Sequence, residues 1–266
     1  AGAGERPGRA RILAVANQKG GVGKTTTAVN LATALAACDK RVLLIDLDPQ
    51  GNATTGLGLG RPALDRSIYA ALLDGAPLAG LVLPTAVPRL AVVPATVDLA
   101  GAEVELVDDA QRQTRLAEAL APVRGDYDYV LIDCPPSLGF LTLNALVAAD
   151  AVLVPLQAEF YALEGLSHLR QTIERVRRAF NPGLAIQGVV LTMVDRRNKL
   201  AEMVEADVRT HMGALVYETM IPRNVRVSEA PSHGKPVLLY DLACAGSQAY
   251  LKLAGELLKR EAARAA

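Results

Sequence analysis

The chain has 266 residues, 51% of them hydrophobic and only 4% aromatic, which is enough for one sizeable aliphatic core. Lys and Arg together number 28, as do Asp and Glu, so the formal net charge is zero and a uniformly basic nucleic-acid-binding protein is excluded. The three cysteines form no CxxC pair, and the apolar stretches are too short or too interrupted by Gly and Pro to span a bilayer, so we expect a cytoplasmic protein without a zinc site.

The N-terminal part predicts a tail, a strand and a helix. Residues 1–10 lack an apolar core and predict a disordered tail, so that residues 11–266 would form the folded domain. An aliphatic run predicts a strand at about 11–16, and an alanine- and leucine-rich pattern predicts a helix at about 25–37. Between them, residues 17–27 read NQKGGVGKTTT and are the most informative stretch of the chain.

A glycine loop between a strand and a helix is the setting of a phosphate-binding loop. Glycines allow the backbone to turn tightly and to point successive N–H groups at anionic oxygens, and the helix N-terminus adds its positive end. We expect Lys24 to reach the β- and γ-phosphates of a nucleotide and the Thr25 hydroxyl to ligate Mg²⁺. The residues expected to cradle the phosphates are Gly20, Gly21, Val22, Gly23, Lys24, Thr25 and Thr26.

The next predicted strand ends in two carboxylates. Residues 41–46 form a short aliphatic run that predicts a buried parallel strand, and a loop with Asp48 and Pro49 follows Asp46. The carboxyl ends of strands are where open α/β sheets bind ligands, so both carboxylates are candidate site residues. The alternative that both side chains cap the following turn stays open.

Residues 61–90 are interrupted by Gly and Pro and predict a connecting region on the sheet edge, with one short helix at 67–73. A strand at 90–95 and two helices, at about 98–107 and 109–121, are predicted to follow.

Another aliphatic strand ends in a single carboxylate. Residues 127–132 lead into Asp133, about a hundred residues after the glycine loop. In this arrangement a buried strand presents a carboxylate to Mg²⁺, usually through a water molecule. The adjoining Cys134 is expected to be a small buried side chain rather than a nucleophile.

Strands and helices continue to alternate toward the C-terminus. The remaining predicted elements are helices at about 141–149, 159–180, 200–211 and 244–263 and strands at 151–155 and 184–194. Alternation of this kind predicts an α/β fold in one domain, with a doubly wound, mostly parallel sheet flanked by helices, as in P-loop NTPases.

Four segments, in this order, resemble the ParA/MinD family of deviant Walker A ATPases: KGGVGKTT at 19–26, DLDPQGN at 46–52, the strand end at Asp133 and IPRNVRVSEAPSHGKPV at 221–237. The last segment is similar to the chromosomal ParA, or Soj, branch of that family. Gln18 stands where the common phosphate-binding loop has its first glycine, and Lys19 is the additional lysine of the deviant loop. The resemblance covers residues 11–260 and implies ATP and Mg²⁺ as cofactors.

The resemblance also implies roles for individual residues. Lys19 would cross a dimer interface to bind the partner's nucleotide, and Asp48 would position or polarise the attacking water. The catalytic residues implied are Lys19, Lys24 and Asp48. The metal site expected is formed by Thr25, Asp48 and Asp133. The loop that would lie over the adenine consists of Pro222, Arg223 and Asn224.

The same resemblance implies that Arg197 and Arg226 lie on a DNA-binding face of the dimer. Arg196 and Lys199 flank the first of these arginines and add positive charge. Contacts to phosphates would give binding without regard to sequence, and two aligned copies would double the patch. The alternative that these side chains are solvated loop charges stays open.

The function implied is that of a chromosome-partitioning ATPase at the nucleoid. It would be an ATP-dependent homodimer that binds double-stranded DNA non-specifically and leaves it after a ParB-like partition protein stimulates slow hydrolysis. A MinD-like membrane-positioning ATPase is the alternative, but the C-terminus ends in alanines without an aromatic residue, so no membrane partner is expected. A relative of the nitrogenase iron protein would require paired cysteine ligands, which the spacing does not provide.

Overall fold

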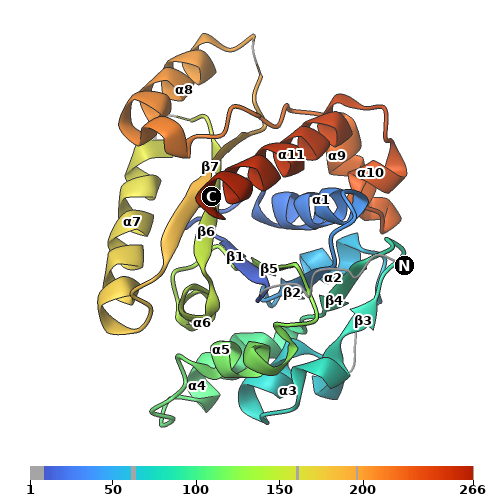
Figure 1. The fold of residues 1–266 in the computed structure, drawn as a ribbon, viewed down its shortest axis with the longest axis vertical. Coiled ribbons are helices and arrows are strands. Elements are labelled where there is room, and N and C mark those ends of the chain that lie inside the picture. The colour runs from blue at the N-terminus through green and yellow to red at the C-terminus, as the bar shows by residue number, and fades with distance from the viewer. Residues whose placement is uncertain (1–8, 61–63, 160–161, 196, 266) are drawn as a thin grey trace.

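The computed structural model describes residues 9–60, 64–159, 162–195 and 197–265 and contains a seven-stranded sheet in the order β3-β4-β2-β5-β1-β6-β7 (Figure 1). The strands are β1 (Arg11–Val15), β2 (Val42–Asp46), β3 (Leu83–Pro84), β4 (Leu90–Val93), β5 (Tyr129–Asp133), β6 (Ala151–Gln157) and β7 (Ala185–Thr192). Every neighbouring pair is parallel except β3 with β4, which confirms the mostly parallel α/β sheet predicted from the sequence.

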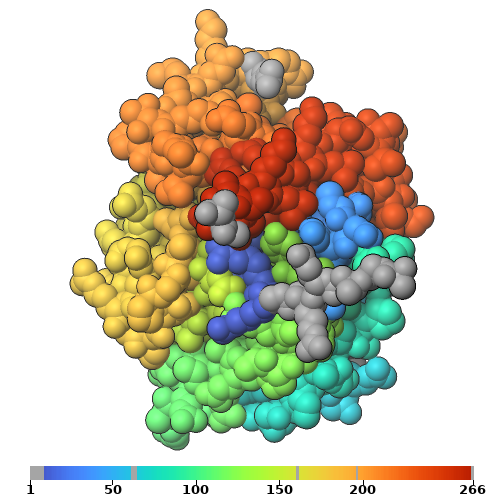
Figure 2. All heavy atoms as spheres, viewed as in Figure 1, coloured from blue at the N-terminus to red at the C-terminus, as the bar shows by residue number. Residues whose placement is uncertain are grey.

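Helices cover both faces of this sheet. They are α1 (Lys24–Ala37), α2 (Asn52–Gly56), α3 (Ile68–Leu73), α4 (Ala102–Glu105), α5 (Arg115–Leu120), α6 (Phe140–Ala148), α7 (Ala162–Ala179), α8 (Lys199–Met212), α9 (Val225–Glu229), α10 (Val237–Tyr240) and α11 (Ala245–Ala265). Helices α1 and α11 pack side by side on one face, where α11 crosses the molecule (Figures 1 and 2). Helices α3, α5, α6 and α7 contribute to the core on the other face.

The central strands β2 and β5 are mainly aliphatic up to the aspartate that ends each of them, because both of their faces are covered. Successive residues of β2 alternate between the two cores: Leu43 and Ile45 join the core beneath α3, α5, α6 and α7, whereas Leu44 joins the core beneath α1 and α11. All five residues of β2 and of β5 are buried. A continuous apolar run therefore marks a strand here, where an alternating pattern would mark a half-exposed one.

Parallel pairing brings three strand ends to one edge of the sheet. Asp133 at the end of β5 lies opposite both Val15 of β1 and Asp46 of β2. The glycine loop leaves directly after β1, and the Asp48 loop leaves directly after β2. Segments that are far apart in the sequence therefore meet around Asp133.

The predicted helices at 98–107 and 109–121 were wrong in their extent. A 3₁₀ turn at Val97–Gly101 precedes the four-residue α4, and the second helix begins only at Arg115. The Asp109 carboxylate accepts hydrogen bonds from the Gln111 amide, at 2.9 Å, and from the Arg115 side chain, at 2.7 Å, which stabilise a turn in place of the first helical residues. Short helices α9 and α10 were not predicted.

The predicted disordered tail includes residues 1–8, which lie outside the described residues. Ala10, at its end, is buried, and its amide donates to the Arg124 carbonyl at 3.1 Å. Among the described residues, no helix combines the length and apolarity that crossing a membrane requires.

Candidate functional site

A pocket of about 440 Å³ opens at the edge of the sheet where the strand ends meet. It combines the glycine loop with the Asp48 loop and with the loop at 222–224, so the structure brings together three of the four motifs at its walls. The residues of the predicted site that line it are Gly20, Gly21, Gly23, Lys24, Thr25, Thr26, Asp48, Pro222, Arg223 and Asn224.

The glycine loop has the backbone conformation that its sequence requires. Gly21 and Gly23 have φ angles of 73° and 83°, in the left-handed region that favours glycine. Gly23 caps the N-terminus of α1, so the first turn of a 14-residue helix begins at Lys24 and faces the pocket. The loop thus presents backbone N–H groups and a helix N-terminus to any anion in the pocket.

Lys24 is buried against this loop, with only 6% of its surface exposed. Its Nζ donates a hydrogen bond of 2.7 Å to the Lys19 carbonyl, which folds the side chain back over the loop. Burial lowers the pKa of Lys24, and the nearby carboxylates of Asp133 and Asp48 partly oppose that shift. An anionic ligand in the pocket would therefore stabilise the charged form of this buried lysine.

Asp133 is fully buried, and neither of its carboxylate oxygens has a hydrogen-bond partner of normal geometry among the described residues. Burial, followed by repulsion from Asp46, raises its pKa well above the usual range, although the Thr25 side chain lies close enough to oppose the shift. An uncompensated buried carboxylate beside a threonine hydroxyl is a donor set that suits Mg²⁺. The described residues provide no cage of three His, Cys, Asp or Glu side chains, so phosphate oxygens and water would complete such a site.

The two aspartates after β2 differ in what they contact. The Asp46 Oδ2 atom accepts hydrogen bonds from the Thr54 amide and hydroxyl, at 2.8 and 2.7 Å, and burial raises the Asp46 pKa to about 6. Asp48 lines the pocket, and its Oδ1 atom accepts a hydrogen bond from the Gln50 amide at 3.0 Å. Asp46 therefore has the role of the alternative given above, because its side chain caps α2 through Thr54. Asp48 accepts one hydrogen bond within its turn and also lines the pocket.

Lys19 has a different environment from the rest of the loop. Its side chain is 42% exposed, and its Nζ forms an ion pair with Glu159 on the surface. It is absent from the described lining of its own chain's pocket. In a single copy, this lysine is therefore available to another molecule rather than to its own pocket.

The loop at 222–224 is attached to the end of β7. Val194 and Pro222 form an isolated parallel bridge, and the Arg223 amide donates to the Val194 carbonyl at 3.1 Å. The Asn224 Oδ1 atom accepts from the amides of Arg226 and Val227, at 2.9 and 3.4 Å, and so caps α9. This cap starts α9 at the edge of the pocket, and Val227 and Ser228 of that helix continue the lining.

Several pocket residues were not predicted from the sequence. They are Gln50, Asn52, Pro136, Thr192, Met193, Ile221, Val227, Ser228 and Tyr250. The Thr192 hydroxyl donates to the Val22 carbonyl at 2.8 Å, and the Thr27 and Tyr250 hydroxyls lie 3.4 Å apart. These contacts join segments separated by more than a hundred residues, and no local pattern indicates them.

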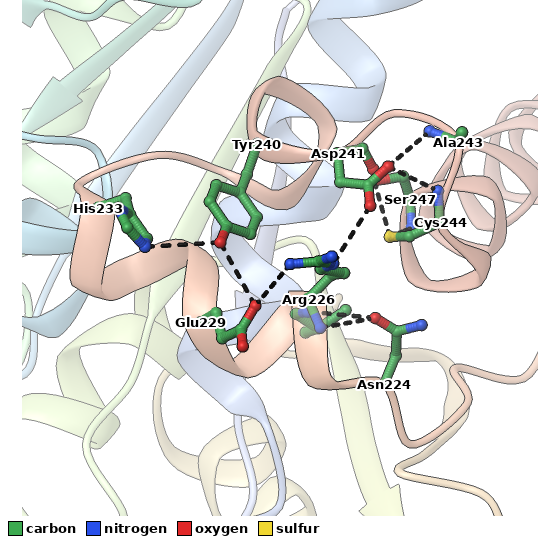
Figure 3. A network of polar contacts seen from close by, with 10 residues as sticks. Asn224, Arg226, Glu229, His233, Tyr240, Asp241, Ala243, Cys244 and Ser247 are labelled. Carbon is green, nitrogen blue, oxygen red and sulfur yellow. Dashed lines mark hydrogen bonds and ion pairs between the residues drawn. The ribbon is translucent and has the colours of Figure 1, made fainter.

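The described cations among those predicted to bind DNA are on the surface, outside the pocket lining. Arg197 lies in the connection between β7 and α8, Lys199 begins α8 and Arg226 lies in α9. Arg226 is surrounded by polar contacts that include Glu229 and Asp241 (Figure 3). Arg196 lies outside the described residues.

Comparison with known proteins places this geometry among related chains. Residues 10–186 match a family model described as an AAA domain. The chain is 64% identical over 258 residues to the chromosome partitioning protein ParA of Caulobacter vibrioides (strain NA1000 / CB15N), covering 96% of this chain and 97% of that protein. It is 53% identical over 247 residues to the sporulation initiation inhibitor protein Soj of Bacillus subtilis (strain 168), covering 93% and 98%.

A solved structure is similar over nearly the whole fold. It is a cobyrinic acid a,c-diamide synthase from Mycobacterium smegmatis with bound ADP and magnesium, which superposes with a TM-score of 0.82 at 40% identity. The match covers 94% of this chain and 95% of that one.

Proposed function

The chain belongs to the ParA/Soj family of chromosome-partitioning proteins, and on this basis we propose that it is an ATPase whose two copies close on ATP and then bind DNA. The observation that carries the proposal is the combination, at one glycine loop, of the buried Lys24 with an Asp133 carboxylate that has no hydrogen-bond partner of normal geometry among the described residues. Burial of either group in charged form destabilises the ligand-free protein. In a bound magnesium–triphosphate, the phosphates would compensate the charge of Lys24 and the metal would compensate that of Asp133.

In this proposal the phosphates lie along the N–H groups at the start of α1, and Lys24 Nζ exchanges the Lys19 carbonyl for phosphate oxygens. Mg²⁺, when bound, neutralises phosphate charge, and Thr25 and Asp133 are the residues that would hold it, the carboxylate through water. The loop at Pro222, Arg223 and Asn224 would contact the base. The ADP and magnesium bound to the M. smegmatis structure support this assignment of the pocket.

Hydrolysis is proposed to be slow in a single copy. Asp48 is only 7% exposed and is held by the Gln50 amide, so it is suited to orient a water molecule near the γ-phosphate. Among the described residues that line the pocket, Lys24 and Arg223 are the positively charged side chains, and Arg223 is assigned to the base. A further cation would therefore accelerate the transfer by stabilising the charge on the departing phosphoryl group.

Lys19 of a second copy is proposed to supply that cation. The Lys19–Glu159 pair is weak and exchangeable, because its side chains are 42% and 43% exposed. When Lys19 binds a buried triphosphate, it loses this contact but forms stronger charge-assisted hydrogen bonds. Dimerisation thereby depends on the γ-phosphate, and a ParB-like partner would act on the closed dimer.

DNA binding is proposed to follow from dimerisation. Arg197, Lys199 and Arg226 of one copy offer few phosphate contacts, and two aligned copies would offer twice as many. We propose that the protein acts at the nucleoid, where non-specific DNA is abundant. Liposome co-sedimentation with ATP tests the MinD-like alternative, which would require membrane binding.

The experiment that tests the function measures molecular mass by light scattering and DNA retention, each with a non-hydrolysable ATP analogue and with ADP. We expect a doubled mass and DNA retention with the analogue alone. Lys19→Ala should bind the analogue as single subunits, and combined Arg197→Ala and Arg226→Ala should dimerise without retaining DNA. Single subunits of the wild-type protein with the analogue, or DNA retention that ignores the nucleotide, would refute the proposal.

A further inference from the structure

Each described arginine predicted to bind DNA is paired with a carboxylate of its own chain. Arg197 forms a bidentate pair with Asp195, through Nε at 2.9 Å and Nη2 at 2.8 Å. The Arg197 amide also donates to Asp195 Oδ1 at 3.1 Å, so backbone and side chain hold the same carboxylate. These contacts lower the pKa of Asp195 to about 2, and its negative charge is therefore present throughout the physiological pH range.

Arg226 lies between two carboxylates (Figure 3). Its Nη1 atom is 3.1 Å from Glu229 Oε2, and its Nε atom is 3.5 Å from Asp241 Oδ2. Tyr240 donates its hydroxyl to the same Glu229 oxygen at 3.3 Å, and the His233 ring stacks on Tyr240. The Glu229 carboxylate is therefore held by Tyr240 as well as by the arginine that it pairs with.

Asp241 is held even more firmly. Its Oδ1 atom accepts hydrogen bonds from the amides of Ala243 and Cys244, at 3.2 and 3.1 Å, and its carbonyl accepts from the Ser247 hydroxyl at 2.7 Å. These contacts form the turn that begins α11, so Asp241 has a structural role independent of Arg226. Only its second oxygen remains for the guanidinium.

The two arginine-bearing segments diverge from one point of the fold. The bridge between Val194 and Pro222 and the hydrogen bond from Arg223 to Val194 join their backbones. Arg197 and Arg226 follow these joined positions by three residues each. Three described cations of this face are predicted to bind DNA, namely Arg197, Lys199 and Arg226. Their formal positive charge equals the formal negative charge of the three carboxylates just described.

These pairs leave donors for a nucleic-acid phosphate. A guanidinium carries five N–H groups, and the Asp195 pair uses Nε and Nη2 of Arg197, while the Glu229 and Asp241 contacts use Nη1 and Nε of Arg226. Within the described part of the chain, Nη1 of Arg197 and Nη2 of Arg226 therefore remain for phosphate oxygens. Phosphate can bind without breaking the pairs, but it then meets the carboxylate's repulsion across the guanidinium.

We propose that Asp195, Glu229 and Asp241 set the DNA affinity of this face by subtracting charge from the arginines that contact phosphate. This proposal rests on the DNA-binding function proposed above. It attributes the weak DNA binding of a single copy to the negative charge of these carboxylates. An arginine paired with a carboxylate gives less long-range attraction and releases fewer counterions, so two copies are needed before the phosphate contacts outweigh the repulsion. Neutralising a carboxylate should therefore strengthen DNA binding.

The test compares Asp195→Asn, Glu229→Gln and the double variant with the wild-type full chain. Binding of two unrelated DNA duplexes is measured by fluorescence anisotropy with a non-hydrolysable ATP analogue, over a series of salt concentrations. Each single variant should bind DNA roughly three- to tenfold more tightly at low salt. Each should also steepen the slope of log K against log salt, by about 0.9 for each additional neutralised phosphate and therefore by up to about 1.8 in a dimer that carries the substitution twice. Analogue affinity and dimer mass should not change.

Glu174→Gln is the matched control. Glu174 pairs with Arg177 at 3.0 Å on the surface of α7, with the same spacing of three residues as Arg226 and Glu229, and α7 carries none of the residues predicted to bind DNA. This variant should bind DNA as the wild type does. Asp241 is left unchanged because it also forms the turn before α11.

The outcomes separate this inference from the function on which it rests. If the wild type retained no DNA with the analogue, the proposed function would fail. If the wild type retained DNA through Arg197 and Arg226, but the Asn and Gln variants bound with equal or lower affinity, the charge-subtraction inference alone would be overturned. An equal gain for Glu174→Gln would also overturn it, because the effect would then come from net charge alone.

Discussion

Replacing Asp133 by asparagine should stabilise the ligand-free protein while removing its response to magnesium and nucleotide. The carboxylate is fully buried, has no hydrogen-bond partner of normal geometry among the described residues and is repelled by Asp46. Burying a carboxylate costs more than burying a neutral polar group, because the carboxylate either stays charged or takes up a proton that the unfolded chain releases at neutral pH. Asp133→Asn keeps the shape and removes this excess cost, so it should raise the free energy of unfolding by about 1–3 kcal/mol.

The assay is thermal unfolding in EDTA at neutral pH, repeated with Mg²⁺ and a non-hydrolysable ATP analogue. A gain of 1–3 kcal/mol corresponds to a Tm increase of roughly 2–10 °C for a domain of this size. Saturating ligand at a hundred times its Kd should add about 2.7 kcal/mol to the wild type. The variant should gain much less, because it lacks the carboxylate that holds the metal.

Asp46→Asn is the matched control, one strand away. Asp46 is equally buried, but its oxygens accept bonds from the Thr54 amide and hydroxyl and from the Asp48 amide. The same substitution should therefore destabilise the protein at this position. If Asp133→Asn lowered Tm in EDTA as much as the control does, the carboxylate would be satisfied in the ligand-free protein and the reasoning would be wrong.

Three further predictions concern the same pocket. Lys24→Ala should weaken ATP binding more than about a hundredfold by calorimetry, because two charge-assisted hydrogen bonds contribute about 1.5–3 kcal/mol each; retained affinity would contradict the loop assignment. Asp48→Ala should preserve ATP binding and dimer mass but slow turnover at least about a hundredfold in a phosphate-release assay; unchanged turnover would remove Asp48 from catalysis. Because burial raises the Asp46 pKa to about 6, the folded protein keeps a proton that the unfolded chain releases near pH 4. The free energy of unfolding should therefore fall as pH rises from about 4 to 6, and Asp133, whose pKa burial also raises, should add to this fall and extend it to higher pH. Urea denaturation across this range measures it, and Asp46→Asn should flatten the slope.

Some parts of the molecule follow from local sequence. The order of strand, glycine loop and helix around Lys24 is confirmed, because left-handed glycines and an amphipathic or aliphatic pattern need only near neighbours. The buried strands β2 and β5 are confirmed for the same reason. The wrong prediction of a helix at residues 109–114 also has a local cause. The Asp109 side chain accepts a hydrogen bond from a backbone amide near the predicted start of the helix and so favours a turn there.

Roles that depend on a distant partner could not be read from the sequence. Asp46 and Asp48 are two residues apart in one motif, yet they have different roles. Asp46 holds α2 through its contact with Thr54, whereas Asp48 lines the pocket, and only the tertiary packing shows this difference. Tyr250 and Thr192 reach the pocket only because the first part of α11 packs against α1 and β7 ends beside the glycine loop.

The sequence by itself determined the sheet, the phosphate loop and the family, since these depend on periodicity and on motifs that are contiguous in the chain. The tertiary structure alone decided which charges are compensated: Asp133 has no hydrogen-bond partner of normal geometry among the described residues, whereas Arg226 lies between two carboxylates. The physical reason is that electrostatic energy depends on distance and burial in space, and separation along the chain fixes neither.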